Sequence, residues 1–170
     1  RVLVMSPNIQ RRLDNYAPGK VEIVSNYPIV SNHPTQGLSL DEYLTNARQF
    51  IYCGTVYGFS VQEEVVKSLH ELSYENSKLS IVGSIANKRK NSISMVGEKY
   101  VEFIPWVTKT ELLERYHNSI CGVVIFKYTP VCCGKEGQMG SNKIFEYMLE
   151  GLPVICTDFS LWKELIIDKY

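Results

Sequence analysis

The sequence has no long apolar run and no excess of charge of either sign, and both absences exclude classes of protein. Its 170 residues include 18 basic and 18 acidic side chains, so the formal net charge is zero. A neutral chain lacks the broad positive field that holds nucleic acid or an anionic membrane. The longest apolar runs, such as residues 122–126, are far too short to cross a bilayer, and no signal segment opens the chain. We therefore expect a soluble domain without a nucleic-acid partner.

Signatures of metal binding, disulfide bonding and dinucleotide binding are also missing. The five cysteines form no C-x-x-C pair, and their odd number fits a reducing compartment better than a disulfide framework. The three histidines are scattered without ligand spacing, so we expect no metal. No G-x-G-x-x-G motif follows an early strand, which argues against a Rossmann dehydrogenase. The cysteine pattern predicts a cytoplasmic protein.

What the sequence does contain is an alternation of short apolar runs and helical patterns. The runs predict strands over residues 2–5, 21–24, 50–53, 79–82, 101–104, 122–126 and 152–156. The patterns predict helices over residues 61–72, 109–118, 142–150 and 161–167. Several strands are continuously apolar, as in a sheet that is covered on both faces. The expected fold class is α/β, with a doubly wound, Rossmann-like parallel sheet.

The first part of the chain departs from this alternation. Residues 26–37 are rich in turn formers and prolines and show no sustained period, which predicts a linker. Residues 1–25, with two expected strands and an intervening helix, are too few for a domain. We expect residues 1–34 to be the remnant of an amino-terminal domain with its linker, and residues 35–170 to be one Rossmann-like domain.

A glycine-rich loop before the helix expected at residues 142–150 indicates an anion site. In doubly wound sheets, ligands bind beyond the carboxyl ends of the strands, where loops lead into helices. Glycine lets backbone N–H groups approach a ligand, and the free amides and dipole of a helix start favour phosphate. A hydroxyl, an amide and a cation stand at this helix start, on Ser141, Asn142 and Lys143. The pattern predicts that a phosphate or diphosphate binds here.

Glu146 lies one turn into the same helix. We expect a buried stripe of Ile144, Phe145, Met148 and Leu149, with Asn142 and Glu146 on a different, more polar side. Because helical side chains lean toward the N-terminus, this carboxylate can reach the helix start and accept hydrogen bonds from two ribose hydroxyls. Alternatively, Glu146 only solvates an exposed face and the glycines form an ordinary loop. The chemistry alone leaves both interpretations open.

The segment "SNKIFEYMLEGLPVICTD" (residues 141–158) resembles the nucleotide-sugar segment of retaining glycosyltransferases of the GT-B fold, with its N-K-x-x-E helix and following G-x-P-V. Further resemblances follow in the family's order: "FIYCGT" (50–55), "LSIVG" (79–83), "VEFIPWV" (101–107) and "ELLERY" (111–116). Upstream, residues 6–13 and 24–28 resemble the end of the amino-terminal domain and its linker. The resemblance covers nearly the whole chain and implies the carboxy-terminal half of a GT-B glycosyltransferase.

The resemblance also implies residue roles. Glu146 would bind the ribose hydroxyls, and Asn142 and Lys143 would meet the diphosphate. The backbone donors would come from Gly137, Gln138, Met139, Gly140 and Ser141. Gly54 and Thr55 would face the phosphates and the donor sugar. Pro105, Trp106 and Val107 would line the nucleobase, although packing is an open alternative for Trp106.

Two positions depart from the family pattern. The family often has two glutamates with seven residues between them, and the first position here is Gln138, which can bond sugar hydroxyls but bears no charge. Residues 54–61 contain neither the arginine nor the lysine that relatives commonly place there. Lys88, Arg89 and Lys90 in the next expected loop either supply the missing charge or form a solvated turn. We assign the catalytic roles to Gln138 and Lys143.

The resemblance implies transfer of a sugar, with retention, from a UDP-type or GDP-type donor to an acceptor hydroxyl, in bacterial polysaccharide or glycolipid biosynthesis. It implies no further cofactor. Its expected partner is the missing amino-terminal acceptor domain, so the isolated chain is expected to bind donor without turning it over. The longer protein is expected in the cytoplasm, at a membrane surface. Two alternatives stay open: a non-catalytic nucleotide-binding module, and a nucleotide-sugar epimerase of the same fold.

Overall fold

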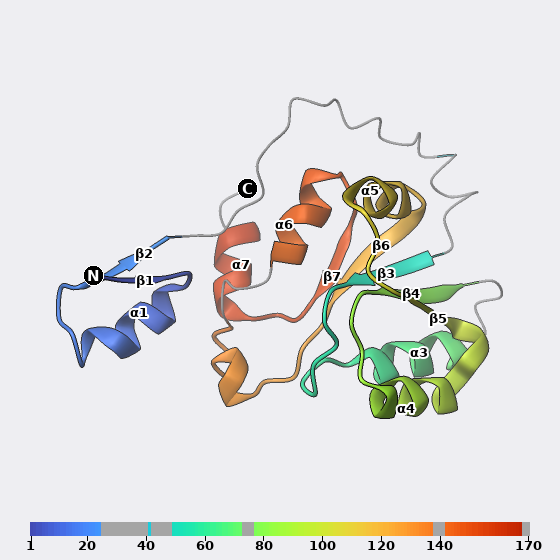
Figure 1. The fold of residues 1–170 in the computed structure, drawn as a ribbon, viewed down its shortest axis with the longest axis horizontal. Helices are drawn as coiled ribbons and strands as arrows, with labels where there is room; N and C mark the ends of the chain where they lie inside the picture. The colour runs from blue at the N-terminus through green and yellow to red at the C-terminus, as the bar shows by residue number, and fades with distance from the viewer. Residues whose placement is uncertain (25–40, 42–48, 73–76, 138–141, 168–170) are drawn as a thin grey trace.

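The computed structural model describes residues 1–24, 41, 49–72, 77–137 and 142–167, and these form two parallel sheets (Figure 1). The small sheet pairs β1 (Val2–Val4) with β2 (Val21–Ile23), and α1 (Pro7–Asp14) joins the two strands. The large sheet has the strand order β5-β4-β3-β6-β7, and every pair in it is parallel.

The large sheet alternates strands with helices. Its strands are β3 (Gln49–Cys53), β4 (Lys78–Val82), β5 (Val101–Ile104), β6 (Ser119–Val124) and β7 (Val154–Cys156). Its helices are α3 (Gln62–Glu71), α4 (Asn87–Gly97), α5 (Lys109–His117), α6 (Asn142–Leu149) and α7 (Ser160–Ile166). Two short 3-10 helices, η1 (Glu98–Tyr100) and η2 (Pro130–Cys132), complete the described elements.

Side chains that alternate along the strands divide the core between the two faces of the large sheet. On β3, Ile51 and Cys53 pack with residues of α5, α6 and α7, whereas Tyr52 packs with residues of α3 and α4. Neighbouring residues of β6, Val123 and Val124, divide in the same way. A sheet with two covered faces needs apolar residues at successive positions, and this explains the continuous runs. The α/β doubly wound fold is confirmed.

All expected strands and helices are present, with shifted ends. The strand expected over residues 122–126 begins at Ser119, and the one expected over 152–156 begins at Val154. The helix α4 was missed, and the expectation of a loop at Lys88–Lys90 was wrong. Ile93 is the one fully buried residue described in α4, so this helix shows little apolar periodicity. The linker predicted over residues 26–37 and the domain boundary at residue 34 lie outside the described residues and stay predictions.

The order of the strands creates a switch point beside β3. From β3 the chain adds β4 and then β5 on one side, and it returns to add β6 and β7 on the other side. The loops at the carboxyl ends of β3 and β6 therefore lead away in opposite directions. In open α/β sheets, ligands bind in the crevice that this reversal leaves.

Candidate functional site

The side chain of Lys143 lies at the switch point, against the loop that follows β3. A methyl group on Gly54 would come within 2.7 Å of Lys143 Cε and 2.9 Å of its Nζ. The ammonium also lies over the ring of Tyr52, 5.3 Å from the ring centre. Burial lowers the pKa of Lys143, while the nearby Cys53 and Glu146 act in the opposite direction. The structure thus brings together two predicted site residues, Gly54 and Lys143, that are far apart in the sequence.

The backbone at this edge is held close by glycines with positive φ. Gly54 donates its N–H to Val82 O at 2.7 Å, and Gly83 donates its N–H to Ile104 O at 2.9 Å. A methyl group on Gly83 would lie only 2.6 Å from Gly54 O. These bonds extend the ladders past the ends of the strands, so the loops after β3, β4 and β5 leave the sheet at one edge. Thr55 follows there, and its carbonyl accepts a 2.7 Å hydrogen bond from Tyr52 Oη.

Asn142 and Glu146 stand one turn apart on α6 and are both half-buried. The side-chain oxygen of Asn142 is buried and has no hydrogen-bond partner among the described residues. Glu146 lies close enough to Lys143, Cys53 and Tyr116 to influence the pKa of each. Glu146 is therefore on the Lys143 side of the helix and not on a remote solvent face. Its role toward ribose stays a prediction.

The expected buried stripe of α6 was partly wrong. Ile144 is buried, but Met148 is 43% exposed, and the fully buried residue is Tyr147. The ring of Tyr147 occupies the space that Gly122 leaves empty in β6, where a methyl group would lie 2.2 Å from the ring. Its hydroxyl accepts a hydrogen bond from Cys53 N at 3.0 Å. Tyr147 thereby ties α6, which carries the predicted site residues, to the end of β3.

The segment predicted to line the nucleobase follows β5. Pro105 and Trp106 are exposed, and Trp106 keeps 63% of its surface accessible. Val107 is half-buried and packs against the core on the α5 side. The exposure of Trp106 means that it does not serve as a core residue in the described structure. Its contact with a base stays a prediction.

Gly137 is the described end of the predicted phosphate loop. It is buried with a φ of 80°, and a methyl group there would lie 2.5 Å from Phe159. Its carbonyl accepts a hydrogen bond from the side-chain amide of Asn8 on α1. The remaining predicted loop residues, Gln138, Met139, Gly140 and Ser141, lie outside the described residues. The contacts of this segment with a donor stay predictions.

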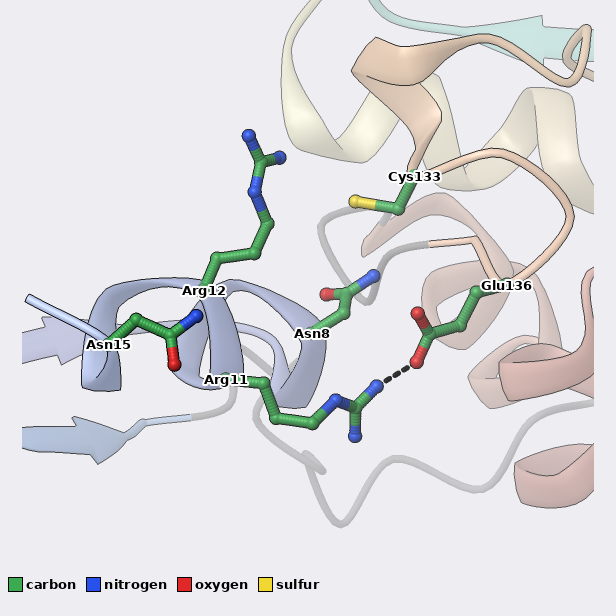
Figure 2. Close-up of a pocket in the computed structure, with 6 residues that line it drawn as sticks. All are labelled: Asn8, Arg11, Arg12, Asn15, Cys133 and Glu136. Atoms are coloured by element: carbon green, nitrogen blue, oxygen red, sulfur yellow. Dashed lines mark hydrogen bonds and ion pairs between the residues drawn. The ribbon is translucent and has the colours of Figure 1, made fainter.

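A cavity of about 370 Å³ opens beside this segment, and it is lined by residues outside the predicted donor site. Figure 2 shows that α1 contributes one wall and the chain after η2 contributes the other. The lining residues are Asn8, Arg11, Arg12, Asn15, Cys133 and Glu136. Arg11 and Arg12 on α1 were the only features in the sequence that could have indicated an anion-binding site here. The sequence alone could not show that Glu136 lies opposite them.

The basic residues of α4 are partly engaged in structural contacts. Arg89 pairs with Glu63 at 2.6 Å and donates a hydrogen bond to Ser60 O. Lys90 lies over the ring of Phe103, 5.1 Å from its centre. Arg89 thus connects α4 to the start of α3.

Among the described helices, none combines the length and the apolar character that crossing a bilayer requires.

Comparison with known proteins gives structural neighbours but no relatives by sequence. No family model and no curated protein matches the chain. The structure is similar to that of TarM, with a TM-score of 0.63 and 14% identity, covering 91% of this chain and 29% of TarM. It is also similar to AviGT4, a glycosyltransferase involved in avilamycin A biosynthesis, with a TM-score of 0.61, 17% identity and coverage of 96% and 47%.

These likenesses support the fold and nothing finer. The chain spans less than half the length of either neighbour. A 2-epimerase from Listeria monocytogenes, described as acting on UDP-N-acetylglucosamine, reaches a TM-score of only 0.43, which is too low to support an argument. The Rossmann-like fold found in GT-B glycosyltransferases is therefore shown for this chain.

Proposed function

We propose that this chain binds the donor of a retaining glycosyltransferase, a nucleoside-diphosphate sugar, at the carboxyl edge of its large sheet. The observation that carries the proposal is the approach of Lys143 to Gly54 at the switch point, with Glu146 one turn further along α6. A cation beside a side-chain-free backbone suits a diphosphate. A half-buried carboxylate behind it suits a pair of ribose hydroxyls.

Lys143 is the proposed catalytic residue because it can stabilise the charge that builds on the leaving diphosphate. Residues 54–61 contain no arginine or lysine, yet the Lys143 ammonium lies against the first residue of that loop. The positive charge of Lys143, on α6, thus lies beside the loop in which the resembling glycosyltransferases commonly carry an arginine and a lysine. Removing one preorganised donor from such a site typically costs about 2–4 kcal/mol of barrier lowering. Gln138 is the proposed partner for the donor sugar's hydroxyls.

The remaining parts of the proposal follow from the resemblance. Gly137–Ser141 and Asn142 would bind the diphosphate, Thr55 would face the sugar phosphates, and Pro105–Val107 would line the base. No cofactor other than the donor is needed. We propose that an acceptor domain outside this chain completes the enzyme and that transfer takes place in the longer protein, at the cytoplasmic face of a bacterial membrane.

A calorimetric panel of UDP, GDP, ADP and their sugars tests the donor site. We expect one diphosphate to bind the wild type and the Glu146→Ala variant to lose most of that binding. Glu150→Ala is the matched control, because Glu150 ends the same helix region but pairs with His117 at 3.3 Å. If no nucleoside diphosphate binds at millimolar concentration, or if both variants bind equally well, the proposal is wrong.

The two alternatives differ in their support. A non-catalytic nucleotide-binding module remains a candidate because Gln138 replaces the usual glutamate, and donor turnover by the longer protein separates it from a transferase. An epimerase needs a histidine at the cleft. Both described histidines, His70 and His117, end helices that lead into the amino ends of β4 and β6, at the opposite edge of the sheet. This position argues against an epimerase.

A further inference from the structure

The cavity of Figure 2 lies between the small β–α–β unit and the loop that leads toward α6. Its volume of about 370 Å³ falls at the lower end of the range for small-molecule sites, about 300–1,000 Å³. Its two walls are more than a hundred positions apart in the sequence. A ligand in this space would contact both units at once.

Some polar side chains of this cavity already have protein partners, and others do not. Arg11 forms an ion pair with Glu136, so the one carboxylate of the lining is already neutralised. Asn8 is also engaged, because it donates to Gly137 O and accepts from Ser6 Oγ and Ile9 N. Arg12 has no ion pair with any described residue, and Figure 2 shows its guanidinium directed away from Glu136. The available groups are therefore Arg12, the amide of exposed Asn15 and the thiol of Cys133.

These available groups determine the class of ligand. A guanidinium offers planar pairs of N–H donors that match the oxygens of a phosphate or carboxylate. An asparagine amide and a thiol add donors without adding negative charge. Because Glu136 is balanced by Arg11, the lining keeps one net positive charge. We propose that this cavity binds an oxyanion, a phosphate or carboxylate group carried by a small sugar-like molecule.

The position of the cavity gives this ligand a role that rests on the proposed function. Glu136, in the cavity wall, directly precedes Gly137, the first residue of the predicted diphosphate segment. An anionic molecule held by Arg12 would lie beside the segment that we propose for the diphosphate. In this proposal the anionic molecule is the acceptor of the sugar, and Arg12 determines the specificity for it.

Cys133 supplies a local measurement of binding. Its side chain is half-buried and points from the loop toward α1, so a bound ligand would shield the sulfur from an alkylating reagent (Figure 2). Cys156 is equally half-buried, lies on β7 and serves as an internal reference. The alkylation rates of both cysteines are measured by mass spectrometry with glucose 6-phosphate, glucuronate, glucose or inorganic phosphate present.

We expect glucose 6-phosphate or glucuronate to slow alkylation of Cys133 at millimolar concentration, with Cys156 unaffected. Glucose should give no protection, and the stronger of the two anions identifies phosphate or carboxylate as the preferred group. Arg12→Ala should weaken the protection at least about fivefold, and Arg12→Lys should retain part of it. Arg1→Ala is the charge-matched control, because it removes one cation from the same unit without touching the cavity lining.

The outcomes separate this inference from the proposed function. Arg12→Ala should keep the affinity of the wild type for the nucleoside diphosphate, whereas Glu146→Ala should keep the protection of Cys133. Equal protection by glucose, no protection by either anion, or full protection in Arg12→Ala each overturns the anion site. Loss of diphosphate binding with retained anion protection would overturn the donor site alone.

Discussion

At the scale of single residues, Gly54 is the position where a small change should affect both folding and diphosphate binding. Its φ of 122° disfavours any side chain, and a methyl group would meet the flexible end of Lys143. We expect Gly54→Ala to lower the free energy of unfolding by about 1–3 kcal/mol, the usual cost of an unfavourable backbone region. We also expect it to displace the Lys143 ammonium and to weaken diphosphate binding at least about tenfold.

Gly58→Ala is the control for this change, because a methyl group there meets nothing within 4 Å and the backbone is not in the positive-φ region. Urea unfolding should place the control within about 0.5 kcal/mol of the wild type. Calorimetry should find its diphosphate affinity unchanged. If Gly54→Ala binds the diphosphate as tightly as Gly58→Ala does, Lys143 is not the phosphate-binding cation.

Tyr147 illustrates what the sequence predicts at this scale and what it does not. The helical period of α6 predicts its start and length, and it separates Glu146 from the apolar stripe. The period cannot predict that Tyr147, a residue with a polar hydroxyl, lies at the centre of the core. That outcome depends on Gly122 in β6 and on the N–H of Cys53, two groups supplied by other strands.

At the scale of elements, α5 has a capping box that fixes where it begins. Thr108 Oγ1 accepts a hydrogen bond from Glu111 N at 3.3 Å, and the Glu111 carboxylate accepts from Thr108 N at 2.9 Å. The pattern T-x-x-E predicts such a box from sequence. Because the loop from Pro105 to Val107 ends at this cap, the box holds the segment that we propose for the nucleobase.

We expect Thr108→Ala to lower the free energy of unfolding by about 0.5–2 kcal/mol, the usual cost of losing an N-cap. Thr110→Ala, the same substitution two residues further along the first turn, should cost much less. Urea unfolding at neutral pH measures both variants. Equal losses would mean that the cap of α5 is not stabilising.

The same cap should depend on pH. The hydrogen bond from the Thr108 backbone lowers the pKa of Glu111 below the ordinary value of a glutamate, 4.5. A carboxylate with a lowered pKa in the folded state stabilises the fold above its unfolded pKa, and this stabilisation is lost as the pH falls through the folded value. The difference in unfolding free energy between wild type and Thr108→Ala should therefore shrink below about pH 4.5.

Elements were predicted well where their residues are periodic and poorly where they are not. Apolar runs located every described strand, and in β4 and β6 they reflect burial on both faces of the sheet. The polar helix α4 was missed because Ile93 is the one fully buried residue described in it, so the sequence shows little apolar period there. The arrangement of the candidate site needed the strand order, since that order places Gly54 beside Lys143.

At the scale of the whole molecule, the contacts between α1 and residues 136–137 join the two units. No pattern in the sequence pairs these segments, because the pairing depends on how the small unit packs against the loop after η2. Asn8 is buried and donates to Gly137 O, whereas the Arg11–Glu136 pair is largely exposed, with 62% and 41% of the two side chains accessible. The buried hydrogen bond of Asn8 should therefore contribute more to the free energy of unfolding than the exposed Arg11–Glu136 ion pair does.

We expect Asn8→Ala to lower the free energy of unfolding by about 1–3 kcal/mol, because it leaves buried partners without their hydrogen bonds. Arg11→Ala should cost less than about 1 kcal/mol, as is usual for an exposed ion pair. Asn15→Ala, the same change as Asn8→Ala at an exposed position just beyond α1, should be nearly neutral. Hydrogen exchange should then report faster exchange of the α1 amides in Asn8→Ala than in either other variant. If α1 exchanges equally in all three variants, the buried amide does not hold the units together, and the wall of the anion cavity depends on the arginine pair instead.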